Sequence, residues 1–183
     1  LGSLPNEAVD AALDGDEAAL LTWLESGGRV NAPCVVDDVS GITALMLAAR
    51  SGHERVVKLL LQRGAETNLQ SSDSLTALML AAGDGQPAIV LRLLRAGVDT
   101  KLRSAKGKSA LQIAKEQGHV ACVEAFRQHI AEVTAGQREA AAGGAGCAIS
   151  GEAASSGSPG ILPNEAVDAA LQGDEAALLA WLD

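Results

Sequence analysis

The stretch Gly41-Ile-Thr-Ala-Leu-Met-Leu-Ala-Ala-Arg-Ser-Gly-His-Glu-Arg-Val-Val-Lys-Leu-Leu-Leu-Gln-Arg-Gly-Ala65 contains one complete structural unit of this chain. It predicts a short helix after Thr43, a turn at Gly52, a second helix and a stop at Gly64. The hydroxyl of Thr43 can cap the first helix, and glycine readily takes the left-handed conformation that ends a helix. One such helical pair cannot bury its apolar face alone, so it must stack on similar units.

The same pattern returns at an interval of 33 residues. The motif Thr-Ala-Leu-Met at 43–46 recurs at 76–79, and Ser-Ala-Leu-Gln stands at 109–112. Turn glycines follow in the same phase, and Gly97 repeats the stop at Gly64. A fixed period of this length is the signature of a helical repeat array.

This unit resembles the ankyrin repeat, whose period is about 33 residues. The resemblance implies an all-α fold, a solenoid of stacked helix-turn-helix units with extended finger loops. Alanine replaces the proline that the family has in its first-helix motif. Met46, Met79 and Gln112 replace the family's histidine, and Ser74 replaces a turn glycine that the neighbouring units keep.

The repeats divide the chain into three parts. An ankyrin-repeat domain is expected over 1–134, with units at about 4–38, 39–71, 72–104 and 105–134. The first unit is aligned at an offset of 37, which places four extra residues within 32–40 and predicts a longer first finger. An Ala/Gly/Ser-rich linker is expected over 135–160, followed by a truncated copy of the first unit over 161–183.

The copy repeats the first unit at an offset of 158. Residues 162–182 differ from 4–24 only by Gln172 for Asp14 and Ala180 for Thr22. This segment carries an apolar helical face that must pack somewhere or fray. Two docking places stay open, the exposed end of the last repeat and a neighbouring chain.

Charge is unevenly distributed along the chain. Residues 1–40 carry −7, residues 41–133 carry +4 and residues 134–183 carry −6, which together give the net charge of −9. The basic residues are densest at Lys101, Arg103, Lys106 and Lys108. This pattern is either an ordinary solvated surface or a means by which the acidic start of one module meets the basic end of another.

No pattern in the sequence predicts catalysis. Nucleotide-binding loops, metalloprotease motifs and the serine-hydrolase motif are missing, so we expect no enzyme activity, no cofactor and no metal. His53 and His119 recur at one repeat position and are interpreted as structural turn residues, while Cys122 is interpreted as core filler. The acidic balance opposes binding to duplex nucleic acid, and no apolar run of the sequence is long enough for membrane insertion.

The predicted function is a non-catalytic scaffold that binds a protein partner. The alternatives are a structural array that self-associates through 161–183 and a regulatory domain of a larger enzyme. By resemblance, partners contact the finger tips and the first-helix face. The candidate contact residues are Asp37, Asp38, Leu47, Arg50, Ser51, Ser72, Asp73, Asp84, Arg103, Lys106, Glu116 and Gln117. We expect an intracellular, cytoplasmic location, with any targeting segment lying before Leu1.

Overall fold

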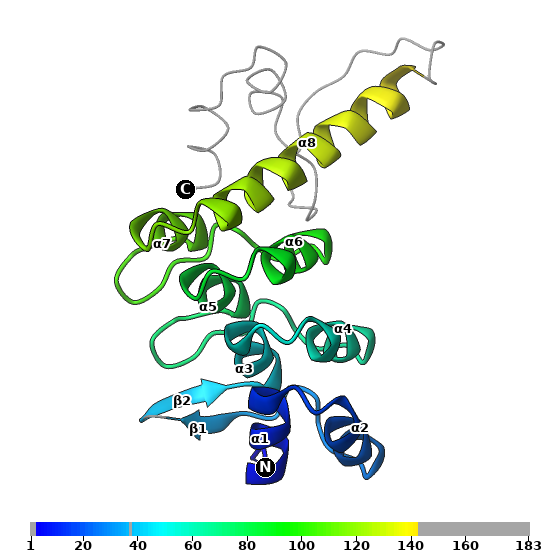
Figure 1. The fold of residues 1–183 in the computed structure, drawn as a ribbon, viewed down its shortest axis with the longest axis vertical. Coiled ribbons are helices and arrows are strands. Elements are labelled where there is room, and N and C mark those ends of the chain that lie inside the picture. Colours follow the sequence, from blue (N-terminus) through cyan, green and yellow to red (C-terminus); the bar gives the residue numbers. More distant parts are fainter. Residues whose placement is uncertain (1–2, 37, 143–183) are drawn as a thin grey trace, which may run out of the picture.

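Four helical pairs stack in a row in the computed structural model, which describes residues 3–36 and 38–142 (Figure 1). The first helices form one row and the second helices form another beside it. The pairs are α1 (Asn6–Asp14) with α2 (Glu17–Glu25), α3 (Ala44–Ser51) with α4 (Glu54–Gln62), α5 (Ala77–Gly83) with α6 (Pro87–Arg95), and α7 (Ala110–Glu116) with α8 (Val120–Ala142). This arrangement confirms the predicted solenoid.

Hydroxyl groups begin the first helices of the three regular repeats, as the sequence predicts. Thr43 Oγ1 accepts a hydrogen bond from the backbone N–H of Met46 at 3.4 Å, and Thr76 makes the equivalent bond at 3.3 Å. Ser109 does the same at 3.3 Å and forms a reciprocal capping box with Gln112. These bonds satisfy N–H groups that a helix leaves without partners at its start.

Small side chains fill the space between the first helices. Ala12, Ala48 and Ala82 are each 0% exposed, so neighbouring helices approach closely along this row. Leucine, valine and isoleucine fill the space between the two rows, and Phe126 is the one phenylalanine of the chain. The low aromatic content of the sequence therefore suits a core built from thin, repeated layers.

The first finger adds a small sheet to this helical fold. Strand β1 (Cys34–Val36) pairs with β2 (Val39–Ile42) in antiparallel register, with Val35 opposite Ser40 and Val36 opposite Val39. The register shifts between Cys34 and Val35. The four extra residues expected in this finger therefore form part of a β-hairpin, which the all-helical prediction did not include.

The last helix is longer than the sequence analysis predicts. α8 continues to Ala142, whereas the linker was expected to begin at residue 135. The sequence Gln-Arg-Glu-Ala-Ala-Ala over 137–142 consists of good helix formers, which explains the extension. The rest of the expected linker and the copy of the first unit lie outside the described residues.

Candidate functional site

The finger loops project on the side of the stack where the first helices lie (Figure 1). Backbone bonds tie each finger to the next: Ser72 N–H donates to the carbonyl of Ser40 at 2.9 Å, and Ala105 N–H donates to that of Asp73 at 2.9 Å. Ser40 N–H also donates to Ser72 Oγ at 3.3 Å. The three fingers consequently form a continuous, ordered edge. We call this edge, together with the exposed first-helix residues, the finger face.

Two histidine side chains each lie within hydrogen-bonding distance of a backbone carbonyl of the preceding repeat. His53 Nε2 lies 2.6 Å from the carbonyl oxygen of Leu13, and His119 Nε2 lies 2.9 Å from that of Gly83. Their rings lie close against Gly15 and Gly85, where any Cβ would be within 3 Å of the ring. The prediction that these histidines are structural turn residues is confirmed.

Most of the candidate contact residues lie exposed on the finger face. Arg50, Ser51, Asp84, Glu116 and Gln117 belong to the first helices or the turns that follow them, and Asp38, Ser72, Asp73, Arg103 and Lys106 belong to the fingers.

Two of the candidates differ from that description. Leu47 is 2% exposed and packs in the core, which corrects its assignment as a partner contact. Leu80, its counterpart in the next repeat, is half-buried. Asp37 lies outside the described residues.

Charges on the finger face change sign along the stack. Asp38 and Asp73 are exposed on the first and second fingers, and Arg103 and Lys106 are exposed on the third. Arg103 is held in place, because its Nη1 donates to the carbonyl of Gly107 at 3.1 Å. These finger residues are therefore acidic toward the first repeat and basic toward the last.

Sequence reasoning missed an apolar residue on the first finger. Val35 is 69% exposed and lies in β1, beside the turn that contains Asp38. Its strand neighbours Cys34 and Val36 are more buried, because side chains alternate across a strand. The extra residues at 32–40 were the available signal, since an insertion in one finger gives that finger a surface of its own.

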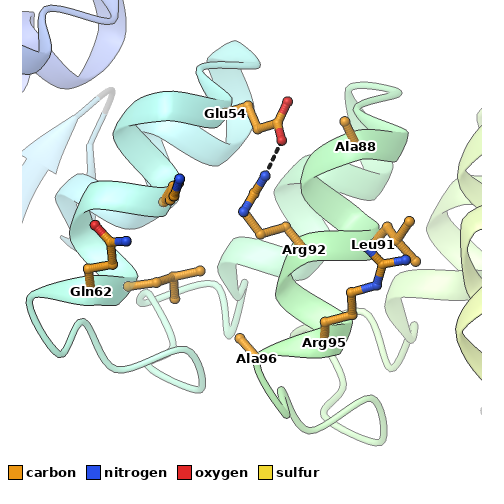
Figure 2. A pocket seen from close by; sticks show the side chains of 9 residues that line it. Glu54, Gln62, Ala88, Leu91, Arg92, Arg95 and Ala96 are labelled. Carbon is orange, nitrogen blue, oxygen red and sulfur yellow. Dashed lines mark hydrogen bonds and ion pairs between the residues drawn. The ribbon is translucent and has the colours of Figure 1, made fainter. Parts of the chain in front are cut away.

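A groove on the second-helix side was also missed. Figure 2 shows it between α4 and α6, with Arg92 directed across the gap to an ion pair with Glu54. Its volume is about 520 Å³, and it is lined by Glu54, Lys58, Leu61, Gln62, Ala88, Leu91, Arg92, Arg95 and Ala96. The groove is formed by helices of two different repeats, so the pattern within one repeat does not reveal it.

The surroundings of the described cysteine thiols disfavour covalent chemistry. Burial raises the pKa of the Cys34 and Cys122 thiols, which disfavours the reactive thiolate. Within 3–36 and 38–142, no group of three histidine, cysteine or acidic residues is placed to hold a metal ion. No helix in the same ranges is long and apolar enough to cross a bilayer.

Comparison with known proteins agrees with the repeat geometry. A family model described as ankyrin repeats (3 copies) matches residues 9–104 and 78–143. Ankyrin repeat domain-containing protein 29 of Danio rerio is 45% identical over 67 residues, which cover 37% of this chain and 22% of that protein. Repeats of this kind are generally protein-interaction modules and typically lack enzymatic activity. The chain belongs to the ankyrin-repeat family.

Proposed function

We propose that this chain is a non-catalytic scaffold that binds a protein partner through the finger face. The observation that carries the proposal is the reversal of charge along hydrogen-bonded fingers, from Asp38 and Asp73 to Arg103 and Lys106. Because the backbones of these fingers are fixed relative to one another, a partner meets a preorganised pattern and little entropy is lost on ordering it. The charges give orientation and specificity more than affinity.

Val35 supplies an apolar contact at the acidic end of the face. A partner that suits this surface has a basic segment near an apolar side chain, with an acidic segment further along. Two charged ends and one apolar anchor define a single binding direction. The buried, unpaired thiols of Cys34 and Cys122 support a reducing, cytoplasmic setting for this interaction.

Site-specific photocrosslinking tests the proposal. The crosslinking amino acid benzoylphenylalanine is placed at Asp73 or Lys106 of the full chain, and at exposed Arg63 of the second-helix side as a matched control. We expect one protein to be crosslinked from both finger positions in a native extract and not from Arg63. The charge reversal Arg103→Glu should reduce the yield at Asp73. Equal yields at all three positions, or none at the fingers, would contradict the proposal.

A further inference from the structure

The first repeat covers the end of the stack through a small set of buried side chains. α1 packs on α3, and α2 packs on α4. The buried residues of this repeat that belong to its helices or precede them are Leu4, Ala8, Ala11, Ala12 and Leu20, each at most 4% exposed. We call the surface of α3 and α4 that they cover the first-repeat seat.

One hydrogen bond joins the first repeat directly to the second, where His53 Nε2 lies 2.6 Å from the carbonyl oxygen of Leu13. A second bond, from Leu4 N–H to the carbonyl of Pro33 at 3.0 Å, holds the start of the first repeat against its own finger. Both bonds use backbone groups of the first repeat. A segment with the same backbone path and the same small side chains would make them equally well.

The chain contains such a segment. The five buried side chains that belong to the helices of the first repeat or precede them are all repeated in the copy at 162–182, as Leu162, Ala166, Ala169, Ala170 and Leu178. The two positions that differ, Asp14 and Thr22, are both exposed in the first repeat. The Thr22 hydroxyl donates to the Ala18 carbonyl of its own helix, so this bond, which the copy lacks, is not one made to α3 or α4.

We propose that residues 162–182 are an alternative occupant of the first-repeat seat, competing there with residues 4–24. The two segments make the same contacts, so the strength of the contacts does not decide between them. Which segment occupies the seat depends on the effective concentration of each segment there. The length of chain that joins the segment to the seat sets this concentration. Residues 162–182 can replace residues 4–24 on the first-repeat seat while the other repeats keep their structure.

The other end of the stack is built differently and does not suit the copy. Ala82 and Leu94, which are buried in the third repeat, correspond to Lys115 and Arg127 in the last repeat. Both charged residues are exposed. Covering them with a helix would desolvate two cations, which opposes the addition of another repeat there.

The copy also lacks the side chain that joins one repeat to the repeat before it. His53, Gln86 and His119 each lie against the turn glycine of the preceding repeat. The corresponding residue of the copy is Asp174. Its counterpart Asp16 instead caps α2, accepting from Ala19 N–H at 3.0 Å. The copy therefore resembles a repeat that starts a stack and not one that continues it.

Tryptophan fluorescence tests the proposal on the full chain. The chain has two tryptophans, so Trp23→Phe leaves Trp181 as the sole emitter. Adding Ala12→Arg should expel residues 4–24 and free the seat, because Ala12 is 0% exposed. We then expect Trp181 to become less accessible to iodide quenching. A further Ala170→Arg change should restore its accessibility, whereas Gln172→Arg should not.

The controls separate docking from unfolding. Gln172 corresponds to exposed Asp14, so its substitution adds the same charge without blocking the seat. Circular dichroism reports whether the remaining repeats stay helical. Where Ala12→Arg unfolds the stack, Leu20→Ala replaces it, because it weakens the packing of residues 4–24 without burying a charge. Unchanged quenching of Trp181 when residues 4–24 are expelled would overturn the proposal. Equal effects of Ala170→Arg and Gln172→Arg would also overturn it.

Discussion

The turn glycines offer a matched test of how closely one repeat approaches the next. Gly85 and Gly118 occupy the same repeat position and have nearly equal φ angles of +71° and +74°. They differ in the atoms that an added side chain would meet. A Cβ added at Gly85 would be 2.7 Å from Nδ1 and 3.1 Å from Cγ of the His119 ring, whereas a Cβ at Gly118 would meet nothing within 4 Å.

The expected costs of alanine substitution follow from this difference. Both changes place a Cβ in the left-handed region, which costs about 1–2 kcal/mol. Gly85→Ala also displaces the rigid ring of His119 and weakens its bond to the Gly83 carbonyl, adding about 1–3 kcal/mol for overpacking and about 1 kcal/mol for the hydrogen bond. We therefore expect a loss of about 1–2 kcal/mol for Gly118→Ala and about 3–6 kcal/mol for Gly85→Ala.

Urea unfolding followed by far-ultraviolet circular dichroism measures both free energies. A double-mutant cycle with His119→Ala isolates the contact, since removing the ring should leave Gly85→Ala with little more than its backbone cost. The cycle should therefore show a coupling free energy of about 2–4 kcal/mol, the sum of the overpacking and hydrogen-bond costs, because the two residues touch. Equal losses for the two glycine variants, or additive effects in the cycle, would refute the explanation.

Three further outcomes are expected. Thr76→Ala removes the cap on Met79 N–H and should lower the free energy of unfolding by about 1 kcal/mol, whereas Thr76→Ser should largely retain it. Ser74 has a φ of +56° where Gly107 has +74°, so Ser74→Gly should raise the thermal midpoint, and a lower midpoint would contradict this reading. Burial lowers the pKa of His129 from its usual 6.5, so the unfolded state binds a proton first and stability should fall as pH drops below about 6.5; His129→Gln should flatten that part of a urea-midpoint profile against pH.

The regular features of the fold were predictable because each is encoded within a single repeat. Thr43 and Ser109 indicate where helices begin, and the glycine period indicates where they turn. His53 could be interpreted correctly because its role depends on its repeat position. Features that depend on contacts between several segments were harder to predict from the sequence. Leu47 occupies a first-helix position whose exposure depends on how the repeats pack, and here the neighbouring helices bury it.

The candidate site was predictable in outline and not in detail. Arg103 and Lys106 were found from the local density of basic residues, and both are exposed. Val35 was missed because the alternation of only three strand residues is too short a signal. The ion pair of Arg92 with Glu54 joins residues 38 positions apart, so its presence follows from stacking geometry that no local pattern specifies.

The length of α8 has a mechanical consequence. Figure 1 shows that this helix begins as part of the last repeat and continues beyond the stack. A pulling force applied at Ala142 would enter through one helix and load the last repeat before any other, because each repeat contacts only its neighbours. The stack should then yield in steps of one repeat, each releasing about 110 Å of chain for 33 residues at about 3.4 Å per residue. Under such a force the protein should therefore lengthen stepwise, beginning at its last repeat.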